Sequence, residues 1–242
     1  MKYIRKNLEP SSFSEWKAQE NDDWKPTWEN FQNPEKSDVH KELLKEQGYI
    51  CCYCGVRITI EVSHIEHFQP RKHYQNLKLE YSNFLASCPG EGDEPDWKNP
   101  QKIPPAQKHC GPKKDSWYDA DLTVSPLLEN CAEYFRYTGF GEILHSNNSI
   151  MIDAARETIN KLGLNQPILQ ISRRKEIQKL LPLIDGCSQA EIELLIQGYQ
   201  EFDSNEQLTP FCAAIIYILK TYFDGSSVVV MPNMSLFTPE PL

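Results

Sequence analysis

Two imidazoles and a carboxylate lie close together in the segment His-Ile-Glu-His, residues 64–67. Metal-assisted hydrolysis needs a base that deprotonates water and a cation that takes up developing charge on oxygen. A neutral imidazole suits the base near pH 7, and we assign that role to His67. Glu66 offers hard oxygen donors to a catalytic Mg²⁺ or Mn²⁺. On an extended strand His64 lies on the same face as Glu66. His64 is therefore a candidate for a further metal ligand or an alternative base.

Cysteines flank this segment on both sides, two in a Cys-x-x-Cys knuckle before it and two after it: Cys51, Cys54, Cys88 and Cys110. Four thiolates suit tetrahedral zinc, and the knuckle brings two of them onto one ion without strain. The pattern therefore predicts a structural zinc site. Cys52 or His109 could replace one of the four ligands.

The bulk composition is that of a folded globular protein. The chain has 242 residues, of which 40% are hydrophobic and 24% charged. The N-terminus has positive charge but no apolar segment behind it, so we expect no secretory signal. The longest apolar run, residues 211–219, is too short to span a bilayer. We expect a cytoplasmic protein without a membrane partner, in which clustered cysteines indicate metal before disulfides.

The net charge of −9 is unfavourable for a nucleic-acid enzyme, because Lys and Arg contacts to phosphate usually dominate such binding. Basic residues do cluster locally, at residues 71–73, 108–114 and 173–175. Either these clusters or a partner must therefore supply the docking surface.

The chain divides into three parts of an α+β protein. Residues 1–48 are polar and end in an expected helix to Gly48. We expect this N-terminal arm to pack its aromatic side chains on the next module, although it could instead bind a partner: Trp16, Trp24, Trp28 and Phe31. Residues 49–121 are rich in Cys, His, Gly and Pro, with a β-like piece at 57–62, and need metal for stability. Residues 122–242 predict a hairpin and then helices.

Local signals place several elements of the last part. Residues 134–137 and 139–144 predict the hairpin. One apolar face runs from Ile152 to Leu162, and Gly163 marks a helix end. Ser188 and Glu191 form a capping-box motif, and Thr-Pro at 209–210 opens a last apolar helix. Residues 211–222 and the tail at 228–231 are candidates for partner docking, with core packing as the alternative for the helix.

These motifs resemble HNH nucleases, which read acid-His-x-x-Pro, then Asn-Leu before a cysteine, then Cys-Asn-x-x-Lys at a helix start. The chain has Glu-His-Phe-Gln-Pro at 66–70, Asn-Phe at 83–84 and Cys-Gly-Pro-Lys-Lys at 110–114. The resemblance covers about residues 49–116 and implies a zinc-stapled ββα-metal core. We expect Asn83 to brace the loop carrying His67 through amide hydrogen bonds, and Lys113 or Lys114 to contact phosphate.

The chain departs from this pattern at Gly111, which replaces the Asn and has no side chain to bind a metal. His109 is the nearest replacement ligand for the catalytic ion, and Asp115 is the second.

A narrower resemblance is to the PtuB-type HNH proteins. It rests on Cys-x-Tyr-Cys-Gly at 51–55, His-Ile-Glu-His-Phe-x-Pro at 64–70, Ser-Pro-Leu at 125–127 and Lys-Leu-Gly-Leu-Asn at 161–165. Those proteins accompany an ABC-type ATPase in Septu and retron-associated anti-phage defence. The resemblance implies a toxic endonuclease effector that works with a PtuA-like ATPase, and with a retron reverse transcriptase and its RNA–DNA product. The substrate stays open between DNA and RNA such as tRNA.

Two other classes of function keep the zinc site. In one, the cysteines organise a zinc-finger module that binds nucleic acid or protein without catalysis. In the other, the chain is an adaptor whose nuclease site is degenerate at Gly111. A simple finger has no use for acid-His-x-x-Pro with Asn83 at this spacing. A Cys-His hydrolase is disfavoured, because zinc would remove Cys51 and Cys54 from covalent chemistry.

Overall fold

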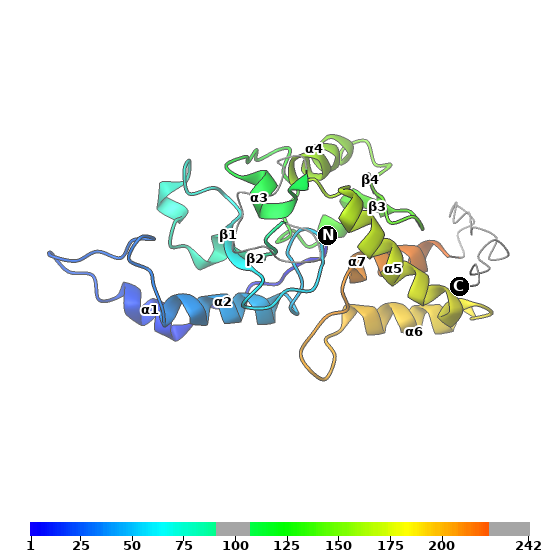
Figure 1. Cartoon of the computed structure of the whole chain (residues 1–242), viewed down its shortest axis with the longest axis horizontal. Helices are drawn as coiled ribbons and strands as arrows, with labels where there is room; N and C mark the ends of the chain where they lie inside the picture. Colours follow the sequence, from blue (N-terminus) through cyan, green and yellow to red (C-terminus); the bar gives the residue numbers. More distant parts are fainter. Residues whose placement is uncertain (91–106, 223–242) are drawn as a thin grey trace, which may run out of the picture.

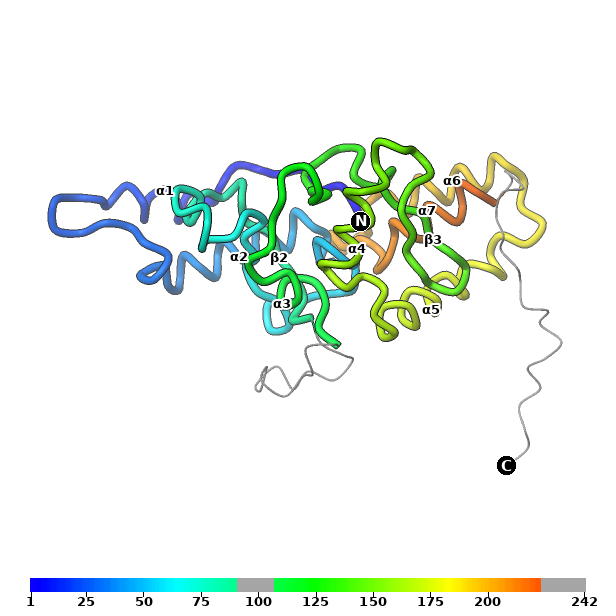
Figure 2. Tube along the Cα trace, turned by 90° about the horizontal axis from the view of Figure 1, so that it is seen from above, coloured from blue at the N-terminus to red at the C-terminus, as the bar shows by residue number. Residues whose placement is uncertain are grey.

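A computed structural model of the chain describes residues 1–90 and 107–222. It combines helices with two small antiparallel sheets, which is consistent with the predicted α+β class. The molecule is elongated: α1 and α2 lie at one end, α5 and α6 lie at the other together with β3 and β4, and the sheet of β1 and β2 lies between the two ends (Figures 1 and 2). The site described below is built from the central part.

The N-terminal arm contains two helices, α1 (Ser11–Lys17) and α2 (Glu35–Glu46). Acidic residues in the first turn of α2 and Lys45 in its last turn complement the helix dipole. The arm buries Phe13 and Phe31 completely, and the Phe13 ring lies 6.0 Å from that of Phe84 in the central sheet. Apolar burial therefore fixes the arm against the strand that follows the candidate site.

The central sheet pairs β1 (His64–His67) with β2 (Phe84–Ser87) in antiparallel register, His64 opposite Ser87 and His67 opposite Phe84. Two short 3₁₀ helices, Gln75–Leu77 and Tyr81–Asn83, lie in the connection between the strands. The short helix α3 (Cys110–Lys114) follows. The elements β1, β2 and α3 carry the motif residues of three separate segments, and they lie in one region of the molecule (Figure 1).

The prediction of a β-strand at residues 57–62 is wrong. The backbone there forms only an isolated bridge between Ile50 and Arg57, which closes the turn of the cysteine knuckle. The Arg57 guanidinium donates to the carbonyls of Gly48 (2.9 Å) and Leu208. This side chain ties the knuckle to the last part of the chain instead of extending a sheet.

The second half agrees with most of its predicted elements. The hairpin is present as β3 (Phe135–Tyr137) and β4 (Ile143–His145), after a 3₁₀ turn at Cys131–Tyr134. Gly163 ends α4 in the left-handed conformation, and Ser188 and Glu191 form the expected capping box of α6. The helices of this half are α4 (Ile152–Leu162), α5 (Pro167–Ile184), α6 (Gln189–Gln200) and α7 (Cys212–Thr221).

Helix α7 packs in the core. It packs on α5, α6 and β3, and six of its ten residues are buried: Cys212, Ala214, Ile215, Ile216, Ile218 and Leu219. Core packing therefore explains the apolar character of this helix. The tail at 228–231 lies outside the described residues. None of the helices in residues 1–90 and 107–222 has the length and apolarity to cross a membrane.

Phe13→Ala should destabilise the protein by about 3–5 kcal/mol, because it removes a fully buried ring at the contact between the arm and β2. The free energy of unfolding would be measured by urea denaturation. Phe202→Ala is the matched control, since Phe202 is 52% exposed and should change stability by less than about 0.5 kcal/mol. Equal, small effects of both substitutions would contradict packing of the arm on the sheet.

Candidate active site and metal centre

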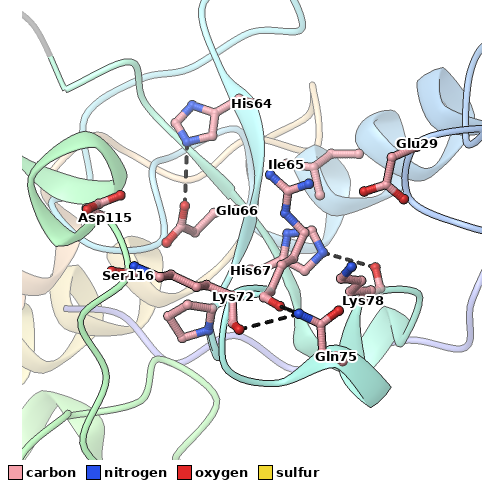
Figure 3. A pocket seen from close by; sticks show the side chains of 12 residues that line it. Glu29, His64, Ile65, Glu66, His67, Lys72, Gln75, Lys78, Asp115 and Ser116 are labelled. Carbon is pink, nitrogen blue, oxygen red and sulfur yellow. Dashed lines mark hydrogen bonds and ion pairs between the residues drawn. The ribbon is translucent and has the colours of Figure 1, made fainter.

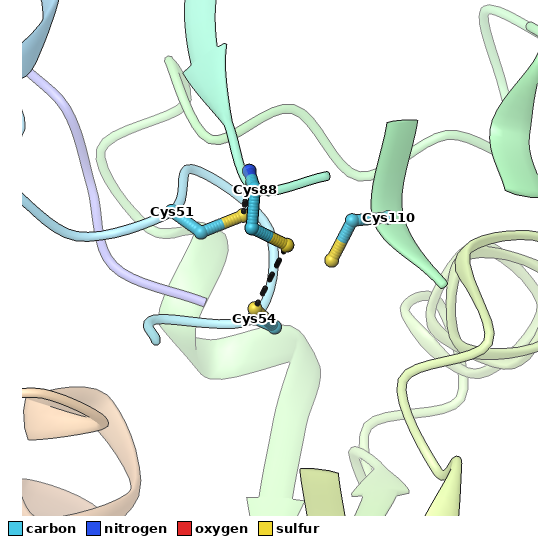
Figure 4. Close-up of side chains that lie close together, drawn as sticks. All are labelled: Cys51, Cys54, Cys88 and Cys110. Atoms are coloured by element: carbon cyan, nitrogen blue, oxygen red, sulfur yellow. Dashed lines mark hydrogen bonds between the residues drawn. The ribbon is translucent and has the colours of Figure 1, made fainter. Parts of the chain in front are cut away.

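The four cysteines singled out by their spacing meet in one buried cluster. The Sγ atoms of Cys51, Cys54, Cys88 and Cys110 all lie within 4.8 Å of one another (Figure 4). Cys54 Sγ and Cys88 Sγ are 3.9 Å apart. Thiolates bound tetrahedrally at about 2.3 Å from zinc lie about 3.8 Å apart, whereas a disulfide needs about 2.05 Å. The cluster therefore has the donor set and spacing to bind a metal ion such as zinc.

Polar groups around the cluster point at its sulfurs. The Cys88 amide donates to Cys51 Sγ at 3.4 Å, and His109 Nδ1 lies 3.2 Å from Cys110 Sγ. Burial opposes ionisation of Cys51, but hydrogen bonds from the surrounding thiols, led by Cys110, outweigh it and lower its pKa. Burial raises the pKa of Cys110. A metal ion that binds this cluster of thiols and thiolates would release protons from the thiols.

His109 does not lie where the role predicted from the sequence would place it. We expected its imidazole to help Glu66 hold a catalytic ion, but its Nδ1 faces the sulfurs of Cys110 and Cys88, the latter at 3.8 Å. Its side chain is only 2% exposed. The structure thus brings His109 to the cysteine cluster, because the extended backbone before α3 carries it next to Cys110.

Glu66 has two carboxylate oxygens in different surroundings. Oε1 accepts hydrogen bonds from Lys114 Nζ (2.9 Å) and the Tyr53 hydroxyl (3.2 Å), and Oε2 lies 3.6 Å from His64 Nε2. Burial opposes ionisation, but the nearby His64 imidazole and the charge of Lys114 outweigh it and lower the pKa of Glu66. The group is therefore a carboxylate held by one oxygen, with the other directed at an imidazole.

Lys114 does not have the exposure expected of a phosphate contact. Its side chain is 2% exposed, and its ammonium donates to Glu66 and to the His67 carbonyl, at 3.0 Å. Lys113 lies beside Gly163 at the end of α4, where a Cβ on that glycine would be 3.2 Å from its Nζ. Neither lysine is among the described residues that line the polar cleft bordered by His64, Glu66 and His67.

His67 ends β1 with its ring fixed in orientation. A backbone carbonyl can only accept, so Nε2 donates to the oxygen of Lys78 at 3.0 Å, which leaves Nδ1 as the acceptor of the neutral ring. The imidazole packs edge-on against Trp28 and Phe84, with centroids 4.4 and 4.9 Å away. Burial lowers the pKa of His67 to about 4, so the ring is neutral at pH 7.

The side chain of Asn83 connects the two ends of the loop that follows His67. Its Oδ1 accepts from the Gln69 amide at 2.8 Å, and its Nδ2 donates to the carbonyls of Gln69 (3.0 Å) and Leu77 (3.3 Å). Leu77 precedes Lys78, whose carbonyl holds the imidazole of His67. The amide therefore fixes both ends of the loop that follows the histidine.

These groups face a cleft of about 450 Å³ with a polar lining (Figure 3). His64, Glu66 and His67 form part of its wall. Among the other charged groups of the lining, Asp115 is the second replacement ligand considered from the sequence, and Arg71 and Lys72 belong to the basic cluster at 71–73. Sequence reasoning did not assign Glu29 and Lys78 to the site, and no local signal indicated them. Glu29 comes from the N-terminal arm, so the arm contributes to the cleft as well as to the core.

Comparison with known proteins gives a retron-associated relative. The chain is 29% identical over 164 residues to a protein of Vibrio cholerae serotype O1 biovar El Tor named "Retron Vc95 putative HNH endonuclease"; the match covers 66% of this chain and 73% of the relative. No protein-family model matches the sequence. The likeness confirms the resemblance to HNH endonucleases of a retron context and supports a nuclease function.

Cys88→Ser should remove the bound metal from the cysteine cluster and lower the thermal stability, because three thiols would hold the ion less tightly. Metal content of the purified protein, measured by mass spectrometry, and the melting temperature are the readouts. Cys187→Ser is the control, since Cys187 lies outside the cluster and is partly exposed. Full metal content in Cys88→Ser would contradict a four-cysteine metal site.

Proposed function

We propose that the chain is a metal-dependent HNH endonuclease that hydrolyses phosphodiester bonds of nucleic acid. The observation that carries the proposal is the setting of His67. Its Nε2 proton is committed to the Lys78 carbonyl, its Nδ1 is the acceptor, and the ring borders a polar cleft next to Glu66. This is the arrangement needed for a general base.

In this mechanism His67 takes a proton from water through Nδ1, and the positive charge it gains lies near the Glu66 carboxylate. Asn83 is a positioning residue, because its hydrogen bonds hold the backbone around the imidazole. Glu66 Oε2 would hold the catalytic divalent ion. A bound Mg²⁺ or Mn²⁺ would stabilise charge on the phosphoryl and leaving oxygens. Arg71 and Lys72 take the phosphate-contacting role first assigned to Lys113 and Lys114.

The cysteine cluster fits a structural zinc ion. Four buried thiols leave no open position for water or substrate, which is typical of structural and not of catalytic zinc. Together with the order β1, β2, α3, this supports a ββα-metal core in which α3 closes the site. The function of the zinc would then be to hold α3 against the strands.

The biological role is proposed from the resemblance and from the retron context of the relative. The chain would be the toxic effector of an anti-phage defence system in the cytoplasm. It would work with an ABC-type, PtuA-like ATPase, and with a retron reverse transcriptase and its RNA–DNA product. The substrate would be DNA or an RNA such as tRNA, since the base and the carboxylate act on the phosphodiester that both share.

His67→Ala should abolish cleavage, with a loss of at least about 100-fold, because the base is removed. Plasmid, single-stranded DNA and total RNA would be incubated with purified protein in Mg²⁺ or Mn²⁺, with and without a co-purified partner. His73→Ala is the control: this histidine is exposed and is not among the described cleft-lining residues. A folded, metal-loaded wild type that cuts none of these substrates would instead support a zinc-binding module or adaptor.

Replacing Arg71 and Lys72 together by Gln should weaken nucleic-acid binding and reduce its dependence on salt. Two lost phosphate contacts lower the slope of log K against log salt by about 1.4–1.8. Both proteins would carry His67→Ala to prevent cleavage, and their binding to nucleic acid would be measured by fluorescence anisotropy between about 50 and 200 mM salt. The control pair, Lys41→Gln with Lys45→Gln, is exposed on α2 outside the described cleft lining and should leave the slope unchanged.

A further inference from the structure

Gly111 lies in α3 with its Cα turned toward the two donors of the cleft wall. A Cβ added at this position would be 2.8 Å from Glu66 Oε2 and 2.9 Å from His64 Nε2. Real Cβ atoms do not approach other atoms so closely, and Glu66 is held in place by Lys114 and Tyr53. The space in front of Gly111 is therefore occupied by the side chains of β1, and a larger residue on α3 would displace them.

His64 and Glu66 are aligned by the strand that carries both. They stand two residues apart in β1, so their side chains leave the same face of the sheet. Glu66 Oε1 has two hydrogen-bond donors, whereas Oε2 is directed at His64 Nε2, 3.6 Å away (Figure 3). One oxygen of the carboxylate thus anchors the residue, and the other forms a pair of potential ligands with the imidazole.

We propose that His64 is the second protein ligand of the divalent ion bound by Glu66, in the place where a side chain on α3 would otherwise bind it. Gly111 leaves room for the imidazole and the ion. The inference rests on the proposed metal-dependent function and specifies its metal site. It replaces His109, which the structure brings to the cysteine cluster.

The geometry fits such an ion. Two donors about 2.1 Å from one ion lie about 3.0 Å apart at a right angle, so 3.6 Å requires only a small closing movement. The His64 side chain is 41% exposed and that of Glu66 11%, which places the pair at the cleft wall, within reach of solvent. Two protein ligands leave positions for water and phosphate oxygens, as Mg²⁺ and Mn²⁺ sites in phosphoryl-transfer enzymes require.

The experiment measures Mn²⁺ binding to the full-length, zinc-loaded protein by calorimetry and electron paramagnetic resonance. His64→Ala should weaken Mn²⁺ binding at least about tenfold and remove a nitrogen modulation from the spin-echo signal of the bound ion. His73→Ala is the matched control, and zinc content reports whether each variant is folded.

Mn²⁺ binding that is unchanged in His64→Ala but lost in Glu66→Ala would overturn the inference and leave the nuclease proposal standing. Retained nitrogen modulation in His64→Ala would also overturn it, since another imidazole would then be the ligand. Absence of Mn²⁺ binding in a folded wild type would overturn it as well. If that wild type also fails to cut nucleic acid, the proposed function fails with it; if it still cuts, only the metal site is wrong.

Discussion

The meeting of four thiols is the constraint on which the geometry of the cleft depends. They come from the knuckle, from the residue after β2 and from the first residue of α3. A helix of five residues is too short to be stable alone, so α3 must be held at its ends. Cys110 holds its start at the cluster, and Lys114 holds its end through Glu66. The same contacts bring Gly111 against His64 and Glu66.

The environment of His67 is assembled from parts of the chain that are far apart in sequence. The backbone carbonyl of Lys78, in the loop between the strands, accepts a hydrogen bond from its Nε2, and Trp28 of the arm and Phe84 of β2 pack against its ring. Removing water from the ring keeps it neutral, and the carbonyl selects its tautomer. The arm is therefore part of the site, because the Trp28 ring that excludes solvent from the imidazole belongs to it.

The sequence predicted which residues converge better than it predicted how their side chains are directed. Spacing alone grouped the four cysteines, and local backbone chemistry placed the helix end at Gly163 and the cap at Ser188. The directions of His109 and Lys114 depend on how α3 is tethered, which is a tertiary property without a local signal. Trp28 sits in a polar segment without periodicity, so nothing in its neighbourhood indicated contact with His67. The apolar periodicity of residues 57–62 failed because no second strand lies beside them.

The charge of the chain limits how it can approach a polyanion. It has 34 acidic residues against 25 basic ones, and buried Lys114 is neutralised by Glu66 and unavailable to phosphate. Screening limits both the attraction of Arg71, Lys72 and Lys78 and the repulsion from the acidic remainder of the surface to about 8–10 Å. Only approaches that present phosphate directly to the cleft are therefore favourable. Under the proposed function, so small a basic surface gives weak binding by the chain alone, and a partner that supplies further phosphate contacts would determine when cleavage occurs.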